Sequence, residues 1–149
     1  MKKYYYPGCK YKNLYLNDDA AYIHSNRLCV TPSSNQYNEL IQNCNIERVT
    51  NYNDIGGLHG RLFTSKINGN QLFFPEANIK TDFEANRENL DNNNKNICFY
   101  WTSTLYSCDG GITRMPEALM IFEDNYRDTK IFISSECHIN GLPIRGVKK

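Results

Sequence analysis

The stretch "FYWTSTLYS" (Phe99–Ser107) decides how this sequence is interpreted. It begins with three large aromatic side chains, the last of which is Trp101, and continues with three hydroxyl side chains in a row. Such a run could form an exposed binding platform, because tyrosine and tryptophan offer a large contact area at a small entropic cost. A sole tryptophan more often packs inside the protein. The stretch therefore predicts a strand with a packed Trp101, and Trp101→Ala is expected to cost roughly 3–5 kcal/mol.

Further strand-like segments surround this stretch. Asn68-Gly69 lies between two short apolar runs and predicts a β-hairpin, because both central positions of a two-residue hairpin turn favour positive φ. Residues 76–96 are polar and predict a long loop. Asp109-Gly110-Gly111, Asp124-Asn125 and Asn140-Gly141 are typical of turns. The strands predicted after the long loop span residues 97–107, 117–124, 128–136 and 142–149.

Two helices are expected before these strands. In Leu16–Asn26, Asn17 can act as the N-cap, and two aspartates follow in the first turn, where the helix dipole favours them. Ser33 and Gln36 form a capping box at the start of a second helix. The apolar stripe of that helix consists of Tyr37, Leu40, Ile41 and Cys44. Helices followed by strands predict an α+β fold, with two N-terminal helices packed on a twisted antiparallel sheet.

Composition and charge narrow the classes of function. The chain has 149 residues, of which 40% are hydrophobic, and this suits one globular domain. A formal net charge of +1 offers no basic field for a nucleic-acid partner. No segment reaches the roughly 18 apolar residues of a membrane span, so no membrane insertion is expected. The start, "MKKYYYPGCKYKN", lacks the apolar stretch of a signal peptide. The protein is therefore expected to stay in the cytosol or to leave it by lysis.

No cofactor or metal is predicted. The cysteines are Cys9, Cys29, Cys44, Cys98, Cys108 and Cys137. Without a secretion signal the reduced state is expected. Because no C-x-x-C pair exists and the histidines lie near no paired cysteines, buried thiols that act as small hydrophobes are favoured over a zinc site. The asparagine run in "LDNNNKN" (Leu90–Asn96) lacks the alternating carboxylates of a calcium loop.

Catalytic patterns are also weak. No G-x-S-x-G elbow occurs in the sequence. Cys137 and His138 are adjacent, so in a strand they would point to opposite faces. Carboxylates that could serve glycoside hydrolysis lie at predicted strand ends and turns, where charged residues are ordinary. The sequence therefore predicts a protein that is not an enzyme.

Five segments follow one another in the order typical of a known family. They are "TPSSNQYNEL" (Thr31–Leu40), "FTSKINGNQLFFPEA" (Phe63–Ala77), "YWTSTLY" (Tyr100–Tyr106), "ALMIF" (Ala118–Phe122) and "GLPIRGV" (Gly141–Val147). On these segments the chain resembles the Fibrobacter succinogenes major paralogous domain family, which occurs in Bacteroidetes surface proteins and their phages. The resemblance covers residues 18–147.

The resemblance implies a C-type-lectin-like domain at residues 18–149, preceded by an arm or a first strand at residues 1–17. In the family the tyrosine–tryptophan segment is mainly a structural signature at the heart of the sheet. Binding surfaces in such folds lie on loops at one end of the sheet, apart from the scaffold. The ligand-binding residues that this expectation selects are Tyr106, Asp109, Arg114, Glu123, Asn125, Tyr126, Arg127 and His138.

The chain also departs from the family pattern. Val30 and His138 stand where the family carries arginine, Gln36 stands where it carries glutamate, and Arg145 is followed by glycine rather than proline. These departures remove expected buried charge pairs but do not affect the fold. The calcium-binding motifs of true C-type lectins, glutamate-proline-asparagine and tryptophan-asparagine-aspartate, do not occur.

The function expected from the resemblance is recognition without catalysis. The protein is expected on a phage virion, in a fibre, capsid or tail, where it binds a host-surface glycan or protein. The alternative is a structural decoration or connector protein that binds only neighbouring virion subunits, through Tyr4, Tyr5 and Tyr6 or as a homo-oligomer. The location would instead be the bacterial surface if a signal peptide had been removed. A related lectin-like fold supports cysteine-based oxidation of sulfatases, but that activity needs a close cysteine pair, and Cys98 and Cys108 are ten residues apart.

Overall fold

The computed structural model describes residues 12–77, 97–108, 113–123, 129–135 and 141–149. Within these residues the chain is an α+β protein with two α-helices and three antiparallel sheets. Along the chain the elements are η2 (Leu16–Asp18), α1 (Ala20–His24), β1 (Cys29–Val30), α2 (Ser34–Asn43), β2 (Cys44–Val49), η3 (Tyr52–Asp54), β3 (Gly60–Ser65), β4 (Gln71–Pro75), β5 (Cys98–Cys108), β6 (Thr113–Glu123), β7 (Thr129–Ser135) and β8 (Val147–Lys148). The predicted fold class, α+β, is confirmed.

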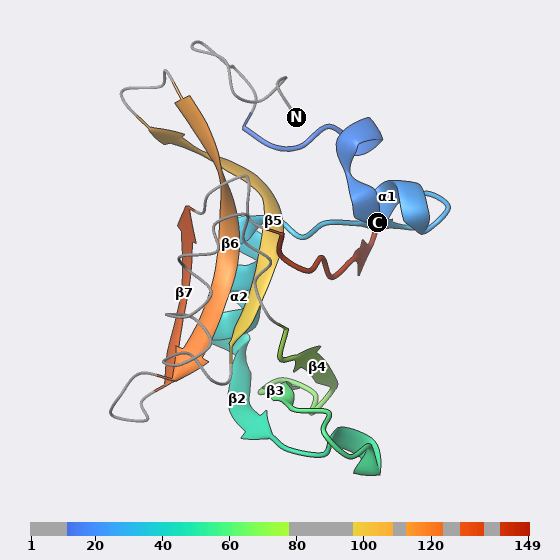
Figure 1. Ribbon diagram of the computed structural model, residues 1–149, viewed down its shortest axis with the longest axis vertical. Helices are drawn as coiled ribbons and strands as arrows, with labels where there is room; N and C mark the ends of the chain where they lie inside the picture. The colour runs from blue at the N-terminus through green and yellow to red at the C-terminus, as the bar shows by residue number, and fades with distance from the viewer. Residues whose placement is uncertain (1–11, 78–96, 109–112, 124–128, 136–140) are drawn as a thin grey trace.

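The three sheets have the strand orders β5-β6-β7, β2-β3-β4 and β1-β8. Figure 1 shows β5, β6 and β7 as the central layer, with α2 across one face. The hairpin of β3 and β4 lies near the lower end of this layer, and α1 lies to one side with the C-terminus. Only α2 packs on the β5-β6-β7 sheet as expected, because α1 packs instead against η2 and β1. Among the described helices, none is long and apolar enough to cross a membrane.

The first predicted helix is split at Asp19. Residues Leu16–Asp18 form a 3₁₀ turn, and α1 starts only after Asp19, which has extended backbone angles (φ −83°, ψ 110°). The Asp19 carboxylate accepts hydrogen bonds from the backbone N–H groups of Ala21 and Tyr22, so Asp19 and not Asn17 is the N-cap. The same carboxylate accepts from Thr31 Oγ1 at 2.6 Å and from Thr31 N at 2.8 Å. This distant contact explains why the cap lies two residues later than the local pattern predicts.

The second helix matches its prediction. Ser33 and Gln36 form the capping box, and each side chain accepts a hydrogen bond from the other's backbone N–H. The helix ends at Asn43, and the chain continues directly into β2, which the sequence did not predict. Cys44 belongs both to the apolar stripe of the helix and to the core-facing side of the strand, where Ile46 follows it. Cys44 thus fits both the helical spacing of α2 and the alternation of β2. The sequence pattern therefore does not show where the helix ends and the strand begins.

The main core lies between α2, the β2-β3-β4 sheet and one face of the β5-β6-β7 sheet. Its buried side chains are Tyr37, Cys44, Phe63, Phe74, Cys98, Tyr100, Leu119 and Ile121. The Phe74 ring lies at the centre of this core. Its centroid is 5.1 Å from that of Tyr100, in an edge-on arrangement, and 4.9 Å from that of Phe63. The Tyr100 hydroxyl donates to the Pro75 carbonyl at 2.7 Å, which gives this buried phenol a polar partner.

Trp101 lies on the opposite face of β5. It is half-buried and packs with Phe122 against a second cluster that includes Phe99, Met120 and Leu142. The expectation that Trp101 packs is confirmed. Tyr100, 4% exposed, rather than Trp101, occupies the main core, because adjacent residues of a strand face opposite sides.

The predicted hairpin is present, but its turn differs from the expected one. β3 and β4 pair from Gly60↔Pro75 to Thr64↔Gln71, and Ser65 N donates to Asn70 O at 2.8 Å. The connection is therefore longer than a two-residue turn. Gly69 has φ +73°, whereas Asn68 is not among the residues with positive φ. A longer loop needs positive φ at only one position, and glycine supplies it without strain.

Candidate functional site

The outer ends of β5 and β6 form a two-stranded extension, here called the ribbon (residues 105–108 and 113–116). Tyr106 lies opposite Met115, and Ser107 lies opposite Arg114. The third strand, β7, pairs with β6 only between Glu117 and Glu123, so the ribbon extends beyond it, as the upper part of Figure 1 shows. Tyr106 is 51% exposed. The structure thus places Tyr106 and the backbone of Arg114, two predicted ligand-binding residues, on the same ribbon.

A bulge in β5 marks the base of the ribbon. The register changes from Trp101↔Ala118 to Leu105↔Pro116, so that three residues of β5 lie opposite Glu117 alone. The bulged residues are Thr102, Ser103 and Thr104, the hydroxyl run of the opening stretch. Bulges bend a strand and strengthen its twist, and proline is tolerated beside them. The hydroxyl run therefore redirects the two strands where they leave the sheet.

Buried hydrogen bonds hold this bulge to the start of α2. Ser34 N donates to Thr104 Oγ1 at 3.0 Å, and Ser103 N donates to the Pro32 carbonyl at 2.8 Å. The Ser34 hydroxyl donates to the Glu117 carboxylate and lies 3.2 Å from Thr102 Oγ1. Thr102 is 2% and Ser34 7% exposed. The Ser34–Thr102 bond is buried and the Ser34–Thr104 and Ser34–Glu117 bonds are partly buried, so together they orient the base of the ribbon.

The N-terminal segment reaches the same bulge. Asn13 forms an antiparallel bridge with Thr104, Leu14 N donates to Ser103 O at 2.8 Å, and Leu105 N donates to Lys12 O at 2.8 Å. Residues 12–14 therefore run along the outer edge of β5. The expected docking residues Tyr4, Tyr5 and Tyr6 lie outside the described part of the chain.

Glu123 lies far from the ribbon, contrary to the expectation that the ligand-binding residues share one end of the sheet. It ends β6, nine positions after Arg114, which corresponds to about 30 Å along a strand. Neighbouring strands of an antiparallel sheet run in opposite directions, so the last residue of β5 and the last residue of β6 lie at opposite ends of the sheet. Five further expected residues, Asp109, Asn125, Tyr126, Arg127 and His138, lie outside the described residues.

Glu123 instead belongs to a group of four charged side chains, here called the ion cluster: Arg48, Arg61, Glu76 and Glu123. Arg61 Nη2 donates to Glu123 Oε1 at 3.2 Å, and Arg48 Nε donates to Glu76 Oε1 at 3.0 Å. Arg48 Nε is also 3.9 Å from Glu123 Oε1. The cluster joins the two larger sheets, because Arg48 and Arg61 come from β2 and β3 and Glu123 comes from β6.

Arg61 is the most deeply buried member of the ion cluster, with a side chain that is 1% exposed. It precedes the core residue Phe63 by two positions on β3, and residues two apart share a face of a strand. Arg61 was not among the residues expected to be functional. All four residues of "GRLF" (Gly60–Phe63) are buried, so no alternation of polar and apolar residues marks Arg61 in the sequence.

Three thiols of the described residues, Cys29, Cys44 and Cys98, take part in no disulfide. Burial raises the pKa of the Cys98 thiol to about 12, against the opposing effect of the Arg61 charge, and burial also raises the pKa of Cys44. Because the thiolate is the nucleophile, both groups are held in their unreactive form at neutral pH. Cys98 and Cys108 lie at the two ends of β5, far too distant for a close cysteine pair.

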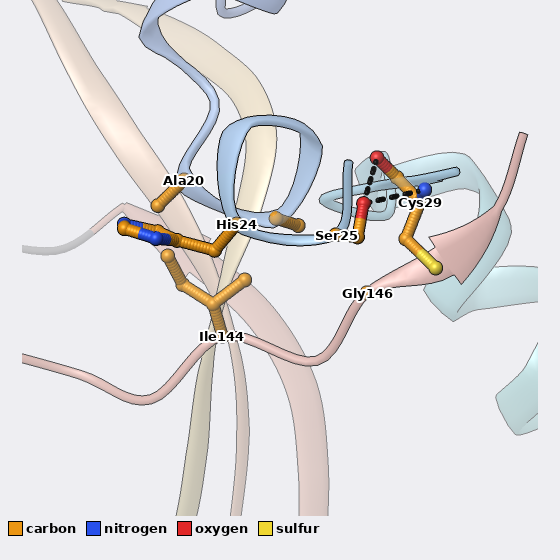
Figure 2. Close-up of a pocket in the computed structure, with 7 residues that line it drawn as sticks. Ala20, His24, Ser25, Cys29, Ile144 and Gly146 are labelled. Carbon is orange, nitrogen blue, oxygen red and sulfur yellow. Dashed lines mark hydrogen bonds between the residues drawn. The ribbon is translucent and has the colours of Figure 1, made fainter. Parts of the chain in front are cut away.

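A shallow pocket of about 430 Å³ lies between α1 and the C-terminal segment. Figure 2 shows the His24 ring beside Ile144, while the Cys29 thiol points toward Gly146, so His24 and Cys29 do not face one another. The Ser25 hydroxyl accepts a hydrogen bond from Cys29 N at 2.8 Å and closes the turn after α1. Across the described residues, no group of three or more His, Cys, Asp or Glu side chains could hold a metal ion.

Comparison of the chain with protein-family models, with curated proteins and with solved structures finds no match. The function must therefore be argued from the ribbon, the ion cluster and the pocket themselves.

Proposed function

We propose that this chain is a recognition domain that binds a host-surface glycan or protein through the ribbon, without catalysis. The observation that carries the proposal is the position of Tyr106, which is 51% exposed on a two-stranded extension that β7 does not accompany. Tyrosine is an efficient recognition residue, since its large ring loses little conformational freedom on binding. It can stack on a sugar ring or pack against a protein surface.

The support beneath the ribbon favours binding. Thr102, Thr104 and Glu117 are tied to Ser34 at the start of α2, so the direction of the ribbon is set before a ligand arrives. A surface that is already ordered loses less entropy on association than a mobile loop does. Recognition residues are most precise when rigid elements and a second layer of hydrogen bonds position them.

The wider setting of this proposal is a C-type-lectin-like domain of the Fibrobacter succinogenes major paralogous domain family, displayed on a phage virion. It draws support from the order of the five sequence segments and from the combination of two helices with antiparallel sheets. The proposed virion location rests on the resemblance to a family that occurs in Bacteroidetes surface proteins and their phages.

The test is binding of the fluorescently labelled protein to intact Bacteroidetes cells, followed by an array of defined glycans. Tyr106→Ala is expected to lower the affinity about tenfold, which corresponds to the loss of one well-placed aromatic contact. The control is Ile67→Ala, because Ile67 is 82% exposed between β3 and β4, away from the ribbon. This control is expected to bind as the parent does.

Treatment of the cells separates the two ligand classes. Periodate destroys a glycan ligand and leaves a protein ligand, whereas a protease does the reverse. If neither the cells nor the array retain the protein, or if Tyr106→Ala binds as well as the parent, recognition through the ribbon is wrong. The structural alternative, a virion decoration or connector protein, then becomes the better account.

A further inference from the structure

The N-terminal lobe, defined as residues 15–30 and 144–149, carries an unusual share of exposed apolar side chains. Nine large hydrophobic side chains of the described residues are exposed. Five of them lie in this lobe: Tyr15, Leu16, Ile23, Leu28 and Ile144. Contiguous exposed apolar surface in a small region marks an interaction site more often than scattered single residues do.

The lobe has too few elements to bury these side chains by itself. Neither η2 nor α1 contains a buried apolar residue, and β1 and β8 pair over two residues only. The lobe is attached through the Asp19 carboxylate and Thr31, which are 3% and 2% exposed, and through Arg145, whose guanidinium lies 5.1 Å from the centroid of the Phe74 ring. A two-stranded sheet with one helical turn gains little stability without further cover. The lobe therefore retains an apolar surface that a partner can cover.

The pocket of Figure 2 makes part of this surface concave. Ala20, Ala21 and His24 of α1 form one wall, and Ile144, 40% exposed, forms the other. Gly146 closes the floor, because a Cβ atom there would meet Cys29 Cβ at 3.0 Å and Ala21 Cβ at 3.4 Å. The pocket volume of about 430 Å³ is ample for one large apolar side chain.

Charge around the pocket is unbalanced. The lobe contains four Lys and Arg residues and two Asp residues, which leaves 13 of the 17 basic and 14 of the 16 acidic residues elsewhere, so the lobe is positive and the remainder negative. Three basic residues of the lobe, Arg27, Lys148 and Lys149, and one acidic residue, Asp18, are exposed. The other two charged residues face inward, since Arg145 lies over the Phe74 ring and the buried Asp19 accepts from Thr31. Lys148 pairs with the pocket residue Cys29 across β1 and β8, so by the pleat of the sheet it shares the face on which the pocket lies.

We propose that the N-terminal lobe docks on an apolar, acidic segment of another protein. An apolar side chain of the partner occupies the pocket beside Ile144, and its carboxylates lie against Lys148 and Arg27. Contact between two such lobes would oppose like charges, which disfavours a second copy of this chain. The concave surface between α1 and Ile144, although shallow, suits a single side chain better than it suits a flat lipid surface. This docking surface is separate from the ribbon and does not depend on what the ribbon binds.

The experiment uses the full chain and two short synthetic peptides that share the same leucines but carry either glutamate or lysine at the other positions. Fluorescence anisotropy is expected to show that the glutamate peptide binds about tenfold more tightly and that added salt weakens it. Ile144→Asp and Lys148→Glu are each expected to weaken its binding about tenfold. Both residues are exposed, so circular dichroism should show folded variants. The matched control is Ile67→Asp, since Ile67 is 82% exposed on the distant β3–β4 hairpin and should not matter.

Several outcomes overturn the proposal. Equal affinity for the two peptides would contradict the role of charge, and unchanged binding by Ile144→Asp would contradict the role of the pocket. If sedimentation shows a dimer that Ile144→Asp dissociates, a second copy covers the lobe. If vesicles of phosphatidylserine and phosphatidylcholine bind the protein while the glutamate peptide does not, the surface is a lipid-binding one.

Discussion

Arg48 and Arg61 lie directly opposite each other on β2 and β3, and both reach the same carboxylate of Glu123. Like charges that face each other across a sheet are destabilising. Here a residue from β6 in the neighbouring sheet offsets the repulsion, with Glu123 Oε1 at 3.2 Å from Arg61 Nη2 and 3.9 Å from Arg48 Nε. The ion cluster therefore links the two larger sheets at the end opposite the ribbon.

Replacing Glu123 by glutamine should destabilise the protein strongly. The Arg61 side chain is 1% exposed, so the substitution removes the charge of an ion-pair partner from a buried guanidinium. Breaking a buried ion pair in this way costs roughly 3–5 kcal/mol, and the partial exposure of Glu123 favours the lower end of that range. Urea denaturation of the parent and of Glu123→Gln measures the difference.

Glu76→Gln is the matched control within the ion cluster. Its partner Arg48 is 33% exposed, and pairs of this kind contribute at most about 1 kcal/mol. Equal losses for the two variants would mean that burial of Arg61 does not determine the energetics of the cluster.

Gly60→Ala should destabilise the β2-β3-β4 sheet. A Cβ atom at Gly60 would lie 2.2 Å from the Phe74 carbonyl oxygen and 2.5 Å from Phe73 Cζ. Phe73 cannot retreat freely, because its ring is stacked on Tyr52 with 3.9 Å between centroids. Overpacking of this kind costs about 1–3 kcal/mol and should appear as a lower melting temperature. Gly56→Ala, where a Cβ atom would meet nothing within 4 Å, should melt as the parent does.

Trp101→Ala should cost about 3 kcal/mol, the lower end of the range for a large core aromatic. Trp101 packs against the cluster of Phe99, Met120 and Leu142, but its side chain is only half-buried. Part of the Trp101 ring already contacts water in the folded state. Removing the ring therefore costs less stability than removing a fully buried ring would. Differential scanning calorimetry measures the loss, and an unchanged melting temperature would restore the view of Trp101 as an exposed platform.

Stability should fall in alkaline solution through Cys98. Burial raises the pKa of its thiol to about 12 in the folded protein, whereas an unfolded cysteine titrates near pH 8.5. Above that pH the unfolded state loses a proton that the folded state keeps, so stability decreases as pH rises toward 12, by up to about 1.4 kcal/mol per pH unit. Below about pH 8.5 the Cys98 thiol is protonated in both states, so it adds no pH dependence to the stability. Denaturation between pH 8 and 11 should show a shallower decline for Cys98→Ala, and identical slopes would contradict this assignment.

The sequence predicted those helices, strands and turns whose formation depends mainly on residues close together in the chain. The Ser33–Gln36 capping box and the stripe from Tyr37 to Cys44 predicted α2, because both patterns repeat within one helical turn or two. The turn at Gly69 and the strands β5, β6 and β7 were likewise visible in short apolar runs, whereas the strand expected at residues 142–149 is limited to β8 (Val147–Lys148). The start of α1 was predicted two residues too early, because the choice of Asp19 as the cap depends on Thr31, which lies twelve positions away.

The sequence by itself thus determined the α+β class, the second helix and the strands from β3 to β7, since local geometry and periodicity encode these. Only the tertiary structure decided that Glu123 joins Arg61 instead of a binding end shared with Arg114, and that the hydroxyl run after Trp101 forms a bulge held by Ser34. These contacts join residues about 60 to 80 positions apart. Their formation depends on which strands pair and on which face each side chain takes, and no local pattern contains that information.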